Sequence, residues 1–318
     1  MNAIETDHLT KFYGQTRAVH DLSLEINNEI FGLLGPNGSG KTTTVLMLTT
    51  LLAPTSGTGS VCGYDILKEG DKVRKKISYV PQEMAVDIKL TGRENVDFFA
   101  KLYGVRDRKN RVKEVLEVME LSDRADDRVG TYSGGMRRRL ELAQALVHEP
   151  EVLFLDEPTI GLDVAARKKI WDHIIALKKN GMTIFVTTHY MDEADHSCDR
   201  VGIISKGTLA VVDSPANLKS NLMKDVITAR IEGEFHDPNL EGVTFIGKVD
   251  DEISFMAENG SEALPLLAHS LSVSGVKVHA LSLHEPTLDD VFLQAVGTVE
   301  EPGAFDFNRF RLMLRRRK

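Results

Sequence analysis

A glycine-rich segment of nine residues carries the first side chains that could do chemistry. Its members are Gly35, Pro36, Asn37, Gly38, Ser39, Gly40, Lys41, Thr42 and Thr43. The apolar run at residues 30–34 predicts a buried strand before it, and the run at residues 44–48 predicts a helix after it. In a strand–turn–helix of this kind, glycines let several backbone N–H groups face one point, and the helix N-terminus adds partial positive charge. The segment therefore predicts a phosphate-binding loop.

Two side chains of this loop suit the phosphates of a nucleotide. Lys41 can reach terminal phosphate oxygens, and the Thr42 hydroxyl can ligate a Mg²⁺ ion that bridges them. Taken alone, the segment leaves open a glycine turn that only happens to precede a helix. The acidic and polar residues farther along the chain favour the nucleotide site.

Two neighbouring acids, Asp156 and Glu157, follow the apolar run at residues 152–155. Such a run predicts a buried parallel strand whose carboxyl end opens on the site. Asp156 could hold Mg²⁺ through water, and Glu157 could polarise the water that attacks the terminal phosphate. Paired acids after a strand are often surface residues, but the phosphate loop upstream favours the catalytic interpretation.

Three more polar or aromatic residues lie at predicted strand ends. His189 follows the strand predicted over residues 183–188, and a strand end on the side of the two acids would let it hydrogen-bond a terminal phosphate. Gln82 closes the strand predicted over residues 77–80, where its amide could contact a metal-bound water and sense nucleotide, although a glutamine there is usually a loop residue. Tyr13 precedes a glycine turn and could fill the core or stack on an adenine ring, with stacking modestly favoured.

A second anion site is predicted at the start of a later helix. Ser133 can cap that helix, and Gly134 and Gly135 leave its positive end open. The first loop already serves one phosphate chain, so this second site needs another explanation. The basic run at residues 137–139 predicts a solvated helix face.

The remaining elements are predicted from periodicity and caps. Residues 3–30 predict two antiparallel strands, and residues 91–148 predict a helical segment that packs on the main sheet. The character of the sequence changes near residue 224. We therefore expect a nucleotide-binding domain over residues 1–223, a small α+β domain over residues 224–298, and a basic tail over residues 299–318 that is disordered or lies against anionic lipid or an acidic partner.

Composition limits the class of protein. The 318 residues are 42% hydrophobic and 27% charged, and the net charge of −8 argues against nucleic acid as a partner bound by bulk electrostatics. The two cysteines, Cys62 and Cys198, are far apart, and a reducing cytosol is the simplest compartment. We find no secretion signal and no apolar run of roughly 20 residues, so a membrane process would need another polypeptide to span the bilayer.

Together these segments resemble the ATP-binding subunits of ABC transporters. In the family's order, the matching motifs are Walker A at residues 35–43, the loop glutamine Gln82, the signature at residues 132–136, Walker B with its glutamate at residues 153–157, the D-loop ending at Asp163, and the switch histidine His189. The amino-acid sequences of residues 132–140, 188–194 and 285–292 are similar to those of daunorubicin-resistance-type exporter ATPases. Met136 and Tyr132 stand where most ABC proteins have glutamine and leucine, and both are common in this branch.

The resemblance implies a fold and a function. The fold is an α/β P-loop NTPase with a mixed sheet core, an antiparallel β subdomain and a helical subdomain, followed by a small C-terminal α+β domain. The function is ATP hydrolysis, with ATP and Mg²⁺, that drives export by a separate membrane permease at the cytoplasmic face of the cell membrane. Drug or antibiotic efflux is one such activity. The alternative is a non-transport ABC ATPase that acts on a soluble partner.

The resemblance also explains the second anion site. In this family two ATPase domains pack head to tail, so each ATP lies between Walker A of one chain and the signature of the other. Ser133, Gly134, Gly135 and Asp163 would then meet the nucleotide in trans. A second copy of the chain, or a close paralogue, is expected as the first partner.

Overall fold

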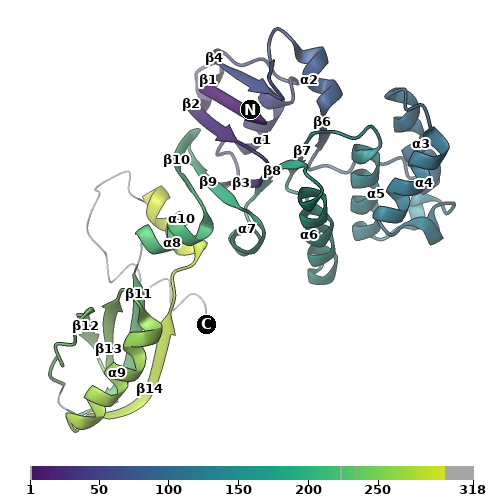
Figure 1. The fold of residues 1–318 in the computed structure, drawn as a ribbon. Helices are drawn as coiled ribbons and strands as arrows, with labels where there is room; N and C mark the ends of the chain where they lie inside the picture. The colour runs from purple at the N-terminus through teal and green to yellow at the C-terminus, as the bar shows by residue number, and fades with distance from the viewer. Residues whose placement is uncertain (1, 223, 234, 298–318) are drawn as a thin grey trace. The chain divides into compact units, whose positions relative to one another are not determined.

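A six-stranded sheet forms the centre of the first part of the chain, in the order β10–β9–β3–β8–β7–β6 (Figure 1). Its strands are β3 (Ile30–Leu34), β6 (Ile77–Val80), β7 (Val152–Asp156), β8 (Thr183–Thr188), β9 (Arg200–Ser205) and β10 (Thr208–Asp213). All neighbours are parallel except β10, which pairs with β9 in the antiparallel sense. Every residue of β3, β7 and β8 is buried, as expected for central parallel strands covered on both faces.

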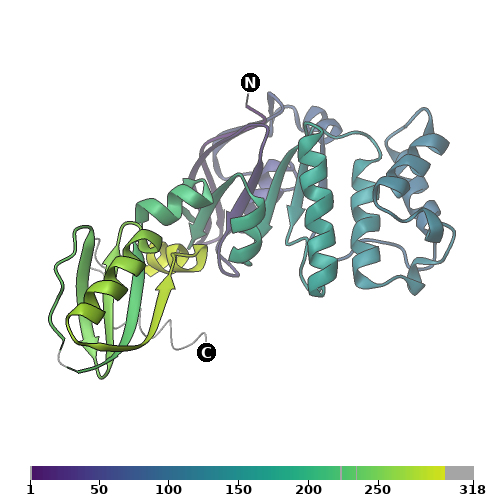
Figure 2. The same cartoon turned by 60° about the horizontal axis from the view of Figure 1, so that its bottom comes forward.

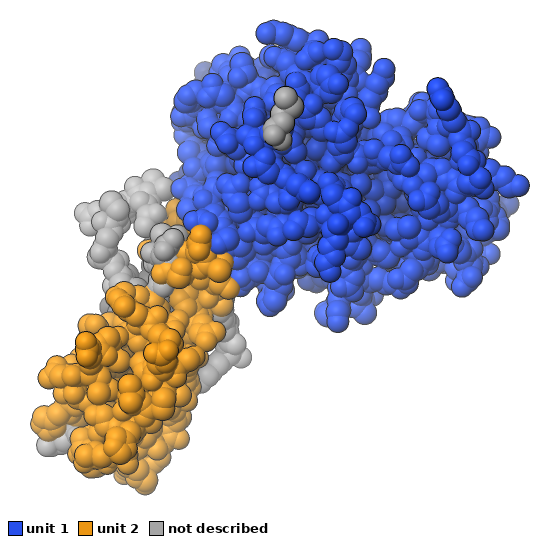
Figure 3. Space-filling view, in the orientation of Figure 1, with its two compact units in different colours: residues 1–215 blue, residues 216–318 orange. Residues whose placement is uncertain are grey.

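The computed structural model describes residues 2–222, 224–233 and 235–297. The chain divides into two compact units, residues 1–215 and residues 216–318 (Figure 3). The three-part division expected from the sequence stays a prediction, and the basic tail lies outside the described residues.

A four-stranded antiparallel sheet lies beside the central sheet, in the order β2–β1–β4–β5. Its strands are β1 (Ile4–Tyr13), β2 (Thr16–Ile26), β4 (Ser56–Val61) and β5 (Tyr64–Asp65). Leu9 and Val19 of this sheet belong to the same buried apolar cluster as Phe31 and Phe154 of the central sheet. One shared core therefore fixes the two sheets against each other, and the two strands predicted within residues 3–30 are confirmed.

The helical elements of this unit follow the predicted signals closely. They are α1 (Lys41–Leu48), α2 (Gly70–Lys76), α3 (Gly92–Leu102), α4 (Arg108–Val118), the 3₁₀ turns η1 (Ser122–Arg124) and η2 (Val129–Thr131), α5 (Gly134–Leu146), α6 (Val164–Lys179) and α7 (Met191–Ser197). Thr91 and Glu94 form a reciprocal capping box at the start of α3. Helices α5 and α6 lie side by side, which both ribbon views show (Figure 1 and Figure 2).

The second unit is a sheet packed against one long helix. Its elements are α8 (Pro215–Leu222), β11 (Asp225–Glu232), β12 (Val243–Val249), β13 (Glu252–Ala257), α9 (Gly260–Val273), β14 (Lys277–His284) and α10 (Leu288–Gly297). The strand order is β12–β13–β11–β14, with antiparallel neighbours throughout. Ile227 and Phe255 of the sheet share a buried cluster with Leu267 and Leu271 of α9. The fold class predicted from the sequence is confirmed for both units.

None of the described helices has the length and apolar character needed to cross a bilayer.

Candidate active site

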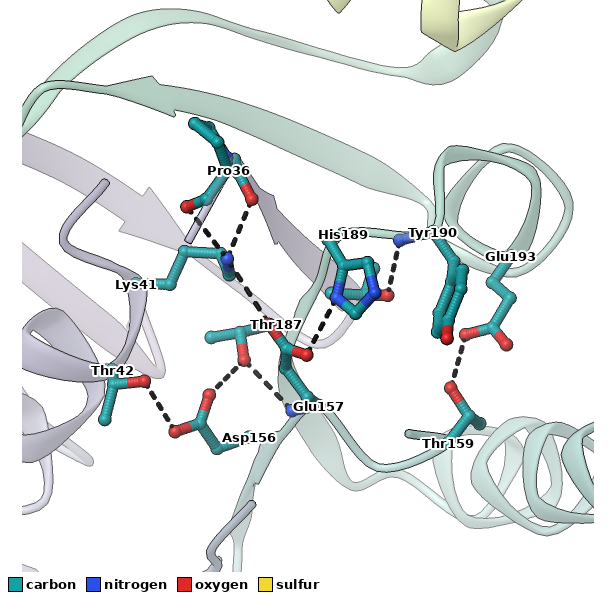
Figure 4. A network of polar contacts seen from close by, with 12 residues as sticks. Pro36, Lys41, Thr42, Asp156, Glu157, Thr159, Thr187, His189, Tyr190 and Glu193 are labelled. Carbon is teal, nitrogen blue, oxygen red and sulfur yellow. Dashed lines mark hydrogen bonds and ion pairs between the residues drawn. The ribbon is translucent and has the colours of Figure 1, made fainter. Parts of the chain in front are cut away.

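The glycine-rich loop joins β3 to α1 and places a buried lysine beneath it. The Nζ atom of Lys41 donates hydrogen bonds to the carbonyls of Gly35, at 2.7 Å, and Pro36, at 3.2 Å (Figure 4). The Lys41 side chain is 5% exposed, whereas Pro36, Asn37 and Gly38 are exposed at the surface of the loop. The ammonium group is thus anchored under a loop whose rim is open to a ligand.

The backbone of this loop requires glycine at two positions for different reasons. Gly40 has φ +108°, and a Cβ atom there would lie 2.4 Å from the carbonyl oxygen of Ala18. A Cβ atom on Gly35 would lie 2.4 Å from the carbonyl oxygen of Ile204. The loop therefore packs directly against the backbone of β2 and β9, which fixes its curvature.

A hydroxyl and a carboxylate meet at the mouth of the loop. Thr42 Oγ1 donates to Asp156 Oδ2 at 2.8 Å, and Thr187 Oγ1 donates to Asp156 Oδ1 (Figure 4). Asp156 is buried at the end of β7, and Thr187 lies beside it on β8. Helix α1 and the strands β7 and β8 thus bring these oxygens to one edge of the central sheet, and oxygen ligands of this kind suit hard divalent cations.

Glu157 lies between a lysine and a histidine. Its Oε1 atom is 3.4 Å from Lys41 Nζ, and its Oε2 atom is 2.8 Å from His189 Nδ1 (Figure 4). The Glu157 side chain is 6% exposed, and its backbone adopts φ +48°, which is uncommon for a residue with a side chain. The Glu157 N–H donates to the carbonyl and the hydroxyl of Thr187, both at 3.1 Å, and these bonds hold the unusual backbone turn.

The ring of His189 packs against the side chain that follows it in the chain. The ring of Tyr190 lies 4.2 Å from the ring of His189, and the Arg167 guanidinium lies 4.5 Å from the Tyr190 ring centroid. Arg167 Nε also donates to the carbonyl of Leu162 at 3.1 Å. A stack of side chains therefore joins His189 to the loop that precedes α6.

Two predicted site residues lie outside this network. Gln82 is exposed in the loop after β6, and none of the hydrogen bonds described above involves it. Tyr13 ends β1 with 49% of its surface exposed, and Lys11 Nζ lies 5.6 Å from its ring centroid. An exposed ring suits the predicted stacking on a base, which stays a prediction.

The predicted trans residues lie at the N-termini of two neighbouring helices. Ser133 caps α5 by accepting from the N–H of Met136 at 3.2 Å, and Asp163 caps α6 by accepting from the N–H of Ala166 at 2.8 Å. Ser133, Gly134 and Asp163 are exposed. These caps leave the positive ends of both helices at the surface.

The prediction of a solvated face at residues 137–139 is wrong for Arg138. This side chain is 3% exposed, and it donates hydrogen bonds to backbone carbonyls around the site. A buried guanidinium is tolerated because those carbonyls and Glu141 satisfy it. Arg138 shares the helical spacing i, i+4, i+7 with the buried residues Leu142 and Ala145, a pattern that is consistent with burial but does not identify the carbonyls that Arg138 meets.

Comparison with known proteins agrees with this geometry. Residues 19–160 match the family described as ABC transporter, and residues 214–296 match the ATP-binding protein DrrA1-3-like, C-terminal domain. The daunorubicin/doxorubicin resistance ATP-binding protein DrrA of Streptomyces peucetius is 40% identical, with 93% of this chain and 92% of that protein covered. The linearmycin resistance ATP-binding protein LnrL of Bacillus subtilis (strain 168) is 36% identical, with 92% and 98% covered.

Other relatives extend the comparison. The Nod factor export ATP-binding protein I of Burkholderia orbicola (strain AU 1054) is 38% identical, with 92% of this chain and 97% of that protein covered. The dimeric post-hydrolysis structure of the ATP-binding cassette MJ0796, bound to ADP and Pi, has a TM-score of 0.60 at 27% identity, over 66% of this chain and 98% of that one. This chain therefore belongs to the ABC transporter ATP-binding proteins, in the branch of the daunorubicin-resistance ATP-binding proteins, and it is an ATPase.

Proposed function

We propose that this chain hydrolyses ATP between two copies of itself and thereby drives export through a separate membrane permease. The observation that carries the proposal is the position of Glu157, which contacts both Lys41 and His189 next to the paired oxygens of Thr42 and Asp156. Relatives named for drug resistance and for Nod factor export support an exporter subunit. They do not favour a non-transport ATPase that acts on a soluble partner.

The contacts of Lys41 suggest how nucleotide binding prepares the site. In the described structure its ammonium group is balanced by Glu157 and by two loop carbonyls. The phosphates of ATP offer Lys41 a stronger anionic partner, so Glu157 is released to accept a proton from the attacking water. His189 keeps the other oxygen of Glu157 oriented, and it would donate to the terminal phosphate.

The residues fit a Mg²⁺ ion at the mouth of the loop. Thr42 Oγ1 and Asp156 Oδ2 are 2.8 Å apart, and both are the hard oxygen ligands that Mg²⁺ takes. Thr42 and Asp156 would hold the ion, Asp156 through water, and the exposed Gln82 amide would reach a metal-bound water. When bound, the ion would neutralise negative charge on the phosphates of ATP.

The dimer proposal rests on the exposed helix caps. Ser133, Gly134 and Gly135 at the start of α5, and Asp163 at the start of α6, would face the nucleotide held by the loop of the second copy. Helix N-termini bind anions well, and the caps already orient the N–H groups of both first turns. The dimeric cassette structure among the relatives supports this arrangement.

A mixing experiment tests the trans arrangement. Gly134→Asp adds a negative charge where the phosphate would approach, and it fits the free chain because its Cβ would meet nothing closer than Leu162, at 3.4 Å. Lys41→Ala disables the loop of the other copy. Mixed dimers of the two variants contain one intact site only if the signature acts in trans, so the mixture should recover roughly a quarter of the wild-type rate.

The controls for this experiment are the two variants alone, both of which should be inactive. A mixture that stays as inactive as its components contradicts the trans arrangement. It would leave Glu157 as the proposed base within one chain.

Docking to the permease is proposed for the segment that follows Gln82. Large apolar side chains are exposed there, at Met84, Ile88, Phe98 and Leu102, with exposed fractions between 45% and 68%. An exposed apolar surface of this kind marks an interaction site. The permease would hold the ATPase at the cytoplasmic face of the membrane.

Capture of the partner tests the transport proposal. Tagged Glu157→Gln protein is expressed in its native host, membranes are solubilised gently with ATP present, and the co-purifying proteins are identified. A polytopic membrane protein is the expected result. The substrate class of that permease would show whether the exporter carries a drug, as the names of several relatives suggest. Ribosomes, nucleic acid or only soluble partners would overturn the proposal.

A further inference from the structure

Helix α5 carries a buried ion pair that contacts the segment around Glu157 and the loop that carries Gln82. Arg138 and Glu141 are each 3% exposed and 2.8 Å apart, within the helix that Ser133 caps. A buried pair of this kind gives little net stability, because removing both charges from water offsets the attraction between them. Its contacts, rather than its energy, indicate what it does.

The guanidinium of Arg138 holds the backbone on both sides of Glu157. Its Nε atom donates to the carbonyl of Pro158 at 2.8 Å, and one terminal nitrogen donates to the carbonyl of Asp156 at 3.2 Å. Between these two carbonyls, Glu157 adopts its left-handed conformation with φ +48°. Arg138 therefore fixes the peptide that precedes Glu157 and the peptide that follows Pro158, and these two bonds restrain the turn that aims the Glu157 carboxylate.

The same pair holds the loop that carries Gln82. The other terminal nitrogen of Arg138 donates to the carbonyl of Pro81 at 2.8 Å, immediately before Gln82. Glu141 Oε1 accepts from the N–H of Ala85 at 2.6 Å, three residues after Gln82. The pair thus grips this loop on both sides of the glutamine.

We propose that Arg138, with Glu141, is a positioning residue for ATP hydrolysis. It links the helix that begins at the signature to the backbone of Glu157 and to the Gln82 loop, so a shift of α5 when the signature meets nucleotide moves both. Only the planar, five-donor fork of arginine can bond three carbonyls and a carboxylate that lie in different directions. This inference rests on the proposed role of Glu157.

The experiment compares two ion pairs on the full chain. Arg138→Gln with Glu141→Gln, the clamp variant, removes both charges without leaving one buried charge unpaired. It also removes most of the hydrogen bonds that hold the backbone around Glu157 and Gln82. The matched control is Arg111→Gln with Glu114→Gln. Arg111 also pairs with a glutamate three residues on, at 2.9 Å, and donates to the carbonyls of Leu146 and Val147 at the far end of α5, away from the proposed site.

The readout separates positioning from folding. We measure kcat and KM for MgATP, the affinity for ATP, and the thermal midpoint of each variant. The clamp variant should lose at least about 10-fold in kcat while its ATP affinity stays within about twofold, since positioning of the base is a transition-state effect. The control pair should keep the wild-type kcat.

Arg138→Lys keeps the proposal testable if the double variant does not fold. Lysine retains the charge opposite Glu141 but cannot span the three carbonyls, so kcat should again fall with little change in ATP affinity. A wild-type kcat in either clamp variant, or an equal loss of kcat and affinity, overturns the inference. A Glu157→Gln variant that hydrolyses ATP normally would instead overturn the proposed function on which the inference rests.

Discussion

Nδ1 of His189 lies 2.8 Å from one oxygen of Glu157, and Nζ of Lys41 lies 3.4 Å from the other. The carboxylate is thus shared between a group from the end of β8 and a group from the start of α1. Each of the three residues follows a different one of the parallel strands β3, β7 and β8. Their meeting is the structural basis of the proposed base.

Replacement of Glu157 by glutamine should separate binding from hydrolysis. The amide keeps the size of the side chain but cannot accept the proton of the attacking water, so turnover should fall roughly 100-fold or more while ATP binding remains. Steady-state hydrolysis and ATP affinity provide the measurement. Glu151→Gln is the control, because Glu151 precedes the other end of β7 and pairs with the half-exposed Lys76. Normal turnover in Glu157→Gln would remove this residue from the role of base.

Truncation of Lys41 should lower the affinity of the protein for ATP. Lys41→Ala removes a buried ammonium that the loop carbonyls hold in place for phosphate, and charge-assisted contacts of this kind justify an affinity loss of about 100-fold for ATP. Titration with a fluorescent ATP analogue measures it. Lys72→Ala is the control, because this exposed amine pairs instead with Glu69, at 2.8 Å. Unchanged binding in Lys41→Ala would contradict the assignment of the phosphate loop.

The loop backbone should not tolerate a side chain at Gly40. Gly40→Ala combines a left-handed φ of +108° with a Cβ atom 2.4 Å from the Ala18 carbonyl, so it should lower the free energy of unfolding by more than about 2 kcal/mol. Gly104→Ala has φ +66° and open space among the described residues, and it should cost about 1 kcal/mol. Urea unfolding followed by the fluorescence of Trp171, the single tryptophan, measures both. Equal losses in the two variants would show that the contact with Ala18 is not the cause.

The stability of the second unit should depend on pH through Asp290. Burial alone would raise the pKa of this carboxyl, but hydrogen bonds from His284 and Thr287 outweigh it and lower the pKa to about 2. A lowered pKa means that the ionised form stabilises the fold above the ordinary pKa near 3.8, and that this contribution is lost as the pH falls toward 2. Asp290→Asn should therefore destabilise the unit by about 2 kcal/mol at pH 7.

Hydrogen exchange of β14 and α10 at several pH values measures this difference. The difference in stability between wild type and Asp290→Asn should disappear between about pH 4 and pH 2, because the wild-type carboxyl loses its charge there. A gap that stays constant over this range would mean that Asp290 acts through its shape and not through its charge. Asp251→Asn, at an exposed position of the same unit, is the control.

The sequence by itself determined which side chains lie together at the carboxyl edge of the central sheet. Parallel strands end at one edge of their sheet, so an apolar run followed by Asp156 and Glu157, and another followed by His189, had to deliver these side chains near the loop of Lys41. Helix caps were equally local, since Thr91 with Glu94 and Ser133 needed only their own first turns to form. Such features depend on spacing along the chain.

Only the tertiary structure decided which groups outside those strands reach the site. Arg138 stands in a run of three arginines that predicts a solvated face, yet α5 packs so that this guanidinium finds the carbonyls of two distant loops. The bonds between Glu157 and Thr187, which hold the turn of the proposed base, likewise join β7 to β8. Carbonyl groups are the same in every residue, so a sequence does not reveal which of them a buried side chain will meet. That choice is made by the packing of the helices on the sheet.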